Sequence, residues 1–376
     1  MRIGIDGIPL ASPRTGVGHY TFELAKTLAL IAPSADFTLI SPKPPGSNRV
    51  GESKLDAPAN LHNIYLSPSL LNLRWWSLSL PIYLTRRPLD LFHGTNYDIP
   101  LWIKRPSVVT IHDLSLLLHP DTHEQRLVSR GRRRLPLMAR SATMIITPSQ
   151  SVKREACEYL EIESSKIAVT PLAPRSIFEP IEREKTLETR RRLGIKDDFV
   201  LFVGTIEPRK NLLTLARAFD DILRTTSLRP QLVIAGMEGW LTNDFFAFIK
   251  RTGLEEHICF TGYLHDEDLR ALYSSCSVFA YPSLYEGFGL PTLEAMACGA
   301  PVICSRIPAI VETVGETACL IDPADRSELA GAIVCLLEDE QARKQLSMSG
   351  LERVKAFSWE RTARATLEVY ERALAM

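Results

Sequence analysis

The sequence lacks the features that mark several classes of protein. It carries no excess of charge, because 44 lysines and arginines balance 44 aspartates and glutamates, so it offers no overall attraction to nucleic acid. No window reaches the ~18 uncharged apolar residues that a membrane span needs. The apolar start, MRIGIDGIPL, is too short for a signal peptide, and we expect none. Any site for an anion must therefore be local.

Cysteine is sparse and shows no pairing pattern. The seven cysteines are odd in number and contain no CxxC pair, and several lie in apolar runs such as PVICS, where cysteine packs as a small hydrophobic residue. This pattern favours a reducing cytoplasm over a disulfide scaffold. We expect a cytoplasmic protein, with the inner face of the cytoplasmic membrane as its further location.

Two segments bear on contact with a membrane. Residues 69–84, SLLNLRWWSLSLPIYL, carry Arg74 inside and Pro81 near the end, so we expect them to pack in a domain core, with a place at a bilayer surface as the alternative. Residues 130–140, RGRRRLPLMAR, are strongly basic. They suit an anionic lipid-linked glycan, a membrane surface or a solvated helix face.

The length of 376 residues and a hydrophobic share of 45% suit two domains of ordinary size. Short apolar runs alternate with longer helical patterns, which is typical of parallel sheets covered by helices. In the first half the predicted strands are 2–6, 37–40, 90–93, 107–111, 144–147 and 167–170, and helices are predicted at 18–31, 123–140 and 150–160. In the second half the predicted strands are 199–204, 231–236, 258–262, 277–283, 301–305 and 318–322.

The Pro-rich and charged stretch 171–186 interrupts this alternation and is the predicted linker. The fold class is therefore α/β. We predict two Rossmann-like, doubly wound domains, residues 1–175 and 176–358, that face each other across a cleft where ligands of such folds bind.

The densest cluster of unusual residues is YPSLYEGFGLPTLEAMACGAPVICS at 281–305. It predicts a strand, a loop that holds Glu286, and a helix that holds Glu294 about one turn inside and ends at Gly299. A carboxylate can accept hydrogen bonds from two neighbouring hydroxyls of a hexose or a ribose. The alternative is that Glu286 and Glu294 are ordinary surface residues at the start of an amphipathic helix. The combination of residues in the whole motif argues against it.

The loop of this motif is suited to a close approach of ligand and backbone. Gly287 and Gly289 remove side chains, so the amides of Phe288, Gly289 and Leu290 are expected to donate hydrogen bonds to a ligand. The helix that follows presents its positive end, which favours a diphosphate.

A second motif is FVGTIEPRKNLLTLARAF at 202–219. A buried strand ends at Gly204, and a short loop brings Arg209 and Lys210 to the start of a helix. Two cations beside a helix N-terminus, at the carboxyl edge of a parallel sheet, predict a phosphate site. A solvated basic pair at a domain edge is the alternative.

Two weaker motifs lie in the first half. TGVGHYTFELAKTL at 15–28 places Gly16 and Gly18 before an amphipathic helix, as a phosphate-approaching loop would, although the spacing does not complete GxGxxG. VVTIHDLSLLLHP at 108–120 places His112 just past a buried strand. There it would hydrogen-bond a sugar hydroxyl or stabilise charge, and a structural histidine is the alternative.

Together with HGTNY at 93–97 and FSW at 357–359, these motifs resemble the GT4 family of retaining glycosyltransferases (glycosyl transferases group 1), which has the GT-B fold. The resemblance covers nearly the whole chain, and the residues of its motifs are most similar to those of bacterial mannosyltransferases. It implies an acceptor-side domain at 1–175 and a nucleotide-sugar donor domain at 176–358. It also implies a last helix, 359–376, that crosses back to the first domain.

The resemblance implies roles for the residues of the 281–305 motif. Glu286 would bind hydroxyls of the donor sugar, and Glu294 would bind the ribose. The loop amides from Gly287 to Leu290 would contact sugar and phosphate.

It implies further roles outside that motif. Lys210 would hold phosphate, Gly16 would belong to the N-terminal glycine loop, and His112 would lie near the donor sugar. Many relatives carry an arginine directly after the strand glycine, where this sequence has Thr205. Arg209 is the candidate to replace it.

No Asp or Glu of these motifs is an evident nucleophile, so retention is expected through front-face attack instead of double displacement. The leaving diphosphate would help to deprotonate the acceptor, while Arg209, Lys210 and the helix dipole stabilise its charge. We identify no DxD motif in the sequence, and the histidines are not clustered at the spacing of metal ligands. We therefore expect neither a metal nor a cofactor.

The resulting expectation is a hexosyltransferase with GDP-mannose as donor. The expected acceptor is a glycan or a lipid-linked oligosaccharide, with peripheral contact to a membrane. The alternatives are a sugar-nucleotide epimerase, a phosphorylase, a non-catalytic sugar-nucleotide-binding protein and a dehydrogenase. The missing GxGxxG and its acidic partner weaken the dehydrogenase.

Overall fold

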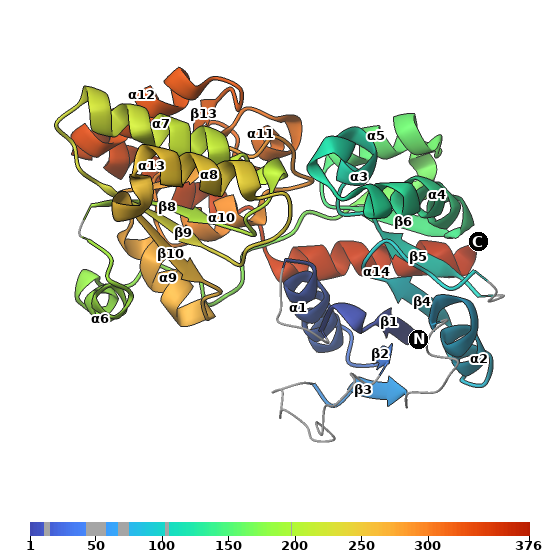
Figure 1. The fold of residues 1–376 in the computed structure, drawn as a ribbon. Helices are drawn as coiled ribbons and strands as arrows, with labels where there is room; N and C mark the ends of the chain where they lie inside the picture. Colours follow the sequence, from blue (N-terminus) through green and yellow to red (C-terminus); the bar gives the residue numbers. More distant parts are fainter. Residues whose placement is uncertain (11–15, 43–57, 67–74, 102–104, 197) are drawn as a thin grey trace. The chain divides into compact units, whose positions relative to one another are not determined.

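The structure is a computed structural model that describes residues 1–10, 16–42, 58–66, 75–101, 105–196 and 198–376 (Figure 1). The chain divides into two compact units. The first comprises Met1–Leu114, Arg130–Leu172 and Ser358–Met376, and the second comprises Ser115–Ser129 and Ala173–Phe357.

The first unit is built on a parallel sheet with the strand order β3-β2-β1-β4-β5-β6-β7. Its central strands are buried on both faces, as continuous apolar strands of a parallel sheet require. The strands are β1 (Arg2–Asp6), β2 (Asp36–Pro42), β3 (Leu61–Leu66), β4 (Leu91–Gly94), β5 (Ser107–Thr110), β6 (Met144–Thr147) and β7 (Ile167–Val169). The helices are α1 (Gly16–Ile31), α2 (Leu80–Thr85), α4 (Gln125–Ser141, from Arg130 onward), α5 (Gln150–Leu160) and α14 (Trp359–Ala375).

The last helix, α14, packs beside α1 in this unit (Figure 1). A buried polar network ties it to the sheet: His93 bonds Tyr370 of α14 at 2.7 Å and Thr110 of β5 at 2.8 Å. Burial lowers the pKa of His93 to about 3, so the ring is neutral at physiological pH. The network therefore joins three elements without burying a charge.

The second unit contains a parallel sheet with the strand order β10-β9-β8-β11-β12-β13. Its strands are β8 (Phe199–Val203), β9 (Gln231–Ala235), β10 (Ile258–Gly262), β11 (Val278–Tyr281), β12 (Val302–Ser305) and β13 (Cys319–Ile321). Its helices are α3 (Ser115–Leu118), α6 (Arg183–Leu193), α7 (Leu212–Thr225), α8 (Asn243–Thr252), α9 (Asp266–Ser275), α10 (Leu290–Ala297), α11 (Pro308–Val314), α12 (Arg326–Glu338) and α13 (Glu340–Val354).

All strands of this second sheet are parallel, but the order in which they are added along the chain reverses between β8 and β11, which are hydrogen-bonded neighbours. This is the switch point of a doubly wound fold, and ligands bind there, outside the carboxyl ends of the strands. The loops that follow β8 and β11 lie side by side at this edge, although about 75 residues separate them in the sequence.

Each predicted strand is present, and one further strand was missed. The missed strand, β3, lies at the edge of the first sheet and shows a mixed burial pattern with polar His62 and Asn63 exposed. An edge strand buries little apolar surface, so the hydrophobic pattern that reveals other strands is absent.

Two predicted boundaries were wrong. Helix α1 begins at Gly16, so Gly16 and Gly18 lie in its first turn and do not precede it, and neither has a positive φ. The predicted linker extends too far, because α6 begins at Arg183. The run REKTLETRRRL consists mostly of strong helix formers, which explains the early start.

The segment 69–84 is described from Trp75 onward, and residues 69–74 lie outside the described residues. Trp75, Leu80 and Leu84 are buried, which confirms for them the expected packing in a core. In the part of the chain that the structure describes, no helix combines the length and apolar character that crossing a membrane requires.

Candidate active site

The two loops at the switch point of the second sheet bring together a cluster of charged side chains. Lys210 ends a short helix after β8, and Glu286 lies in the loop between β11 and α10. Lys210 Nζ lies 2.5 Å from Glu286 Oε1, and Arg209 Nη1 lies 3.1 Å from Glu286 Oε2. The neighbouring strands thus unite three of the predicted site residues.

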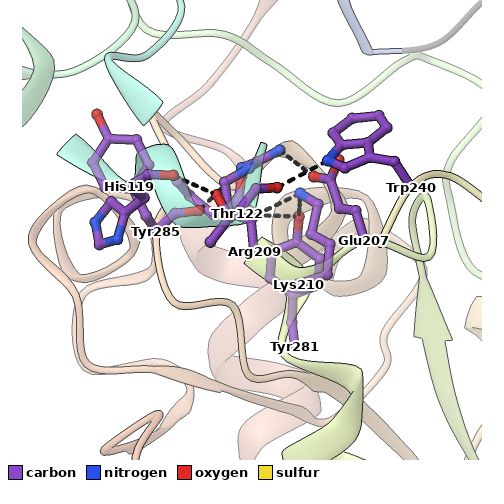
Figure 2. A network of polar contacts seen from close by, with 9 residues as sticks. His119, Thr122, Glu207, Arg209, Lys210, Trp240, Tyr281 and Tyr285 are labelled. Atoms are coloured by element: carbon purple, nitrogen blue, oxygen red, sulfur yellow. Dashed lines mark hydrogen bonds and ion pairs between the residues drawn. The ribbon is translucent and has the colours of Figure 1, made fainter. Parts of the chain in front are cut away.

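Two residues that the sequence did not suggest complete the cluster. Tyr281, at the end of β11, donates to Glu286 Oε1 at 2.9 Å and accepts from Lys210 at 2.8 Å. Glu207 pairs with Arg209 at 2.6 Å. Figure 2 shows Glu207, Arg209, Lys210 and Tyr281 together in this network. Glu207 stands inside the TIEPRK motif and Tyr281 opens the YPSLYEGFG motif, so their position beside motif residues was an available signal.

Burial and pairing set the charge state of this cluster. Lys210 is 8% exposed and Glu286 is 9% exposed. Burial alone would raise the pKa of Glu286, but the charges of Lys210 and Arg209 outweigh it and lower the pKa to about 2. Because this pKa lies below the ordinary value of 4.5, the pair stabilises the fold above about pH 4.5 and loses that contribution as the pH falls through 2.

The sequence suggested that Arg209 and Lys210 give the site a net positive charge for binding phosphate. The structure shows that this expectation was wrong. Glu207 and Glu286 balance Arg209 and Lys210, so the cluster is neutral. An ammonium has three donors, and among the described residues only Tyr281 and Glu286 accept from Lys210. The cluster can therefore offer a phosphate a hydrogen-bond donor without offering excess charge.

The glycine loop has the geometry that the sequence predicts. Gly289 has φ +89°, and a Cβ there would lie 2.2 Å from Ile310 Cδ1, so only glycine fits. The amides of Phe288, Gly289 and Leu290 donate to none of the described residues. The side chain of Phe288 packs against Phe357, with the ring centroids 5.9 Å apart. Ligand binding by these amides and by Gly287 stays a prediction.

Glu294 occupies a different place in the same unit. It lies one turn inside α10, and its Oε1 accepts from Arg175 Nε at 3.1 Å. Burial raises the pKa of Glu294, and Arg175 offsets this only in part. The sequence missed Arg175, although a single arginine within the apolar run PLAPRSIF was a usable signal.

The segment Ser115–Ser129 packs within the second unit next to the charged cluster. The ring of His119 lies 4.9 Å from that of Tyr285, the residue before Glu286. Trp240 Nε1 donates to the carbonyl of Thr122 at 2.8 Å (Figure 2). These contacts join segments more than 100 residues apart, so no local sequence signal could have revealed them.

His112 lies in the first unit, directly after β5. Its Nε2 donates to the carbonyl of Thr95 at 2.8 Å, which leaves Nδ1 as an acceptor in the neutral ring. Burial lowers its pKa, which favours that neutral form. The imidazole ring of His112 makes T-shaped contacts with the rings of Tyr20 and Tyr97, with ring centroids 4.9 and 5.8 Å apart. The arrangement suits the predicted hydrogen bond with a hydroxyl.

Gly16 also lies in the first unit, at the exposed start of α1. A Cβ built at Gly16 would meet no heavy atom within 4 Å. The absence of a side chain is therefore not required by packing among the described residues, and a role in ligand approach stays a prediction.

The expectation that the sequence holds no DxD motif was wrong, because Asp266-Glu267-Asp268 forms one outside the motifs described above. In the structure it opens α9, where Asp266 pairs with Arg175 and Asp268 pairs with Arg192. Both aspartates are thus engaged by arginines. No group of three or more His, Cys, Asp or Glu side chains suited to a metal is found among the residues that the structure describes.

Two parallel, doubly wound sheets in one chain are the architecture of the GT-B fold. Comparison with known proteins agrees. Residues 14–173 match the profile of "Glycosyltransferase Family 4", and residues 185–353 match that of "Glycosyl transferases group 1". The O-antigen chain mannosyltransferase B of Escherichia coli is 31% identical over 388 residues, which cover 99% of this chain and 100% of that protein. The chain belongs to this GT4-type family and is a glycosyltransferase.

Other similar proteins fit the same assignment. A mannosyltransferase of Mycolicibacterium hassiacum, named MMP alpha-(1->4)-mannosyltransferase, is 30% identical over 72% of this chain and 66% of its own length. The sucrose-phosphate synthase of Thermosynechococcus elongatus matches with a TM-score of 0.81 and 24% identity over 100% of this chain and 99% of its own. HepE of Anabaena, solved with UDP and glucose, has a TM-score of 0.75 and 21% identity over 98% and 99%. These two structures show the shared fold.

Proposed function

We propose that the protein transfers mannose from GDP-mannose to a glycan or lipid-linked acceptor, with retention of anomeric configuration and without a metal. The observation that carries this proposal is the cluster of Lys210, Arg209 and Glu286 beside the amides of Phe288, Gly289 and Leu290, which donate to none of the described residues. Mannose is supported by the names of the relatives, a mannosyltransferase of O-antigen chains among them.

The chemistry of Glu286 supports front-face attack. Its two oxygens are engaged by Lys210, Arg209 and Tyr281, and its low pKa makes it a weak base. A carboxylate so bound is a poor nucleophile. Its Oε2 has one remaining lone pair, which is suited to accept a hydrogen bond from a sugar hydroxyl while the carboxylate stays ionised.

In the proposed step the bond between the anomeric carbon and the phosphate oxygen breaks, and the acceptor oxygen bonds to the anomeric carbon on the same face. The proton of the acceptor hydroxyl passes to the leaving phosphate oxygen. The remaining Lys210 donor and the amides from Phe288 to Leu290 stabilise the charge that develops on the diphosphate.

A panel of nucleotide sugars, each assayed with and without excess EDTA, tests donor and metal together. We expect transfer from GDP-mannose, undiminished by EDTA, because backbone amides and Lys210 handle the diphosphate and both aspartates of the DxD pair are engaged by arginines. A donor at 100 times its dissociation constant should also stabilise the fold by about 2.7 kcal/mol in a thermal shift assay.

Four outcomes would contradict parts of this proposal. Activity that EDTA abolishes and magnesium restores would show a metal-dependent enzyme. Preference for another nucleotide sugar would replace the donor. Conversion of the nucleotide sugar without an acceptor would favour the epimerase alternative, and an inverted anomeric signal in the product would exclude retention.

The basic part of α4 supports the proposed contact with an anionic membrane. Arg132, Arg133 and Leu137 are exposed, and neither arginine forms an ion pair with a carboxylate of the described residues. Arg130 and Arg134, by contrast, pair with Asp98. An exposed face with unpaired arginines and a leucine is suited to anionic headgroups.

Replacing Arg132 and Arg133 by glutamine should weaken binding to vesicles of phosphatidylglycerol and phosphatidylethanolamine by roughly 30-fold, since each arginine near an anionic surface contributes about 1 kcal/mol. Sedimentation with vesicles measures this. Arg191→Gln with Arg251→Gln, two exposed arginines of the second unit, removes the same charge as a control. Equal loss in both variants, or binding to neutral phosphatidylcholine, would contradict a specific role of α4.

A further inference from the structure

Arg175 is a buried arginine that no motif assigns to the site. It lies in the stretch before α6 and is 6% exposed. Its Nε donates to Glu294 Oε1 at 3.1 Å, and its Nη1 lies 2.5 Å from Asp266 Oδ1. Its guanidinium lies over the ring of Phe178, 4.5 Å from the centroid. Three elements thus fix one guanidinium.

The contact leaves Glu294 able to bind a ligand. No donor from the described residues reaches its Oε2, and Oε1 uses one of its two lone pairs on Arg175. The carboxylate can therefore still accept from two neighbouring hydroxyls. Its side chain is 7% exposed, so without a partner it would be a buried carboxylate that tends to take up a proton.

A protonated or rotated Glu294 would be a poor acceptor for a diol. One oxygen would carry a hydrogen, and the charge that strengthens the hydrogen bonds would be lost. The fixed guanidinium of Arg175 opposes both changes, because it donates to one defined oxygen from a position set by Asp266 and Phe178.

We propose that Arg175 is a positioning residue for nucleotide binding, which holds the Glu294 carboxylate as a charged acceptor for the 2′- and 3′-hydroxyls of the ribose. The inference rests on the proposed function, in which Glu294 meets the ribose. It adds that the ribose is recognised through a pair of residues, one of which comes from outside the motifs.

Calorimetry with GDP and with 2′,3′-dideoxy-GDP separates this role from a structural one. The wild type should prefer GDP by roughly 10-fold or more, the worth of a charge-assisted hydrogen bond. Arg175→Gln should reduce that preference to near unity, because GDP loses affinity while dideoxy-GDP, which has no hydroxyls to lose, binds as before. In the background of Glu294→Gln, the same change should alter the preference no further.

Arg192→Gln is the matched control. It removes an arginine that pairs with Asp268 of α9, the helix that also holds Asp266, it leaves the contact between Arg175 and Glu294 in place, and Arg192 is 55% exposed, so the fold should tolerate the change. It should leave the preference for GDP within about twofold of the wild type. If Arg175→Gln fails to fold, Arg175→Lys gives the same comparison, with a several-fold loss of preference because a point charge lacks the guanidinium geometry.

Equal weakening of both nucleotides by Arg175→Gln would overturn the inference and assign Arg175 a structural role. A wild type that binds GDP but does not distinguish it from dideoxy-GDP would also overturn it, and the proposed function would stand. A wild type that binds neither nucleotide would contradict the proposed donor itself.

Discussion

Lys210→Met is expected to lower affinity for the nucleoside diphosphate by one to two orders of magnitude, since a charge-assisted hydrogen bond to phosphate contributes roughly 1.5–3 kcal/mol. The buried pairing with Glu286 adds a second effect. Removing one partner of a buried ion pair costs about 3–5 kcal/mol of folding free energy. The Lys210 variant is therefore expected to lose stability as well as affinity.

Calorimetry with GDP and urea denaturation measure the two effects separately. The double variant Lys210→Met with Glu286→Gln removes both charges, so it should recover most of the lost stability without recovering binding. Lys344→Met, at an exposed i,i+4 pair with Glu340, is the control and should change neither quantity much. Unchanged GDP affinity in a folded Lys210 variant would place the phosphate site elsewhere.

Glu286→Gln is expected to reduce turnover with the sugar donor by roughly 10- to 100-fold and to leave binding of GDP nearly intact. Glu286 lies beside the glycine loop, so it should meet the transferred sugar. Glu294→Gln should instead weaken GDP and GDP-mannose alike, because both contain the ribose. Glutamine keeps the shape of the side chain and removes the charge and one acceptor oxygen.

Kinetics and calorimetry of both variants, each with donor and with GDP, give four comparisons. Denaturation should accompany them, because Glu286→Gln leaves Lys210 and Arg209 without one of their partners. A folded Glu286 variant that loses GDP binding, while the Glu294 variant keeps it, would show that the donor lies in the opposite direction along the loop and helix.

Local physical chemistry explains why much of the fold could be read from the sequence. Runs such as FVLFV and VICS are apolar throughout, because strands of a parallel sheet are buried on both faces. Gly289 and Gly299 mark the two ends of α10, since their positive φ values strongly favour glycine. Where burial is one-sided, as in edge strand β3, the same reasoning failed.

The candidate site was predicted residue by residue but not as an arrangement. The motifs named Lys210, Arg209 and Glu286 separately, with the cations as a free phosphate site and the carboxylate as a free sugar ligand. Their mutual pairing depends on β8 lying next to β11, and strand order leaves no trace in either motif.

The sequence by itself thus determined the class of fold, the loop and helix of the site and the family to which they belong, because those depend on residues close together in the chain. The tertiary structure decided which charges meet: Lys210 with Glu286 across 76 residues and Arg175 with Glu294 across 119. The first contact, together with the pairs of Arg209 with Glu207 and Glu286, turns the expected surplus of positive charge into a neutral buried cluster. Electrostatic energy depends on distance in space and on burial, and neither quantity is set until the strands are ordered in the sheet.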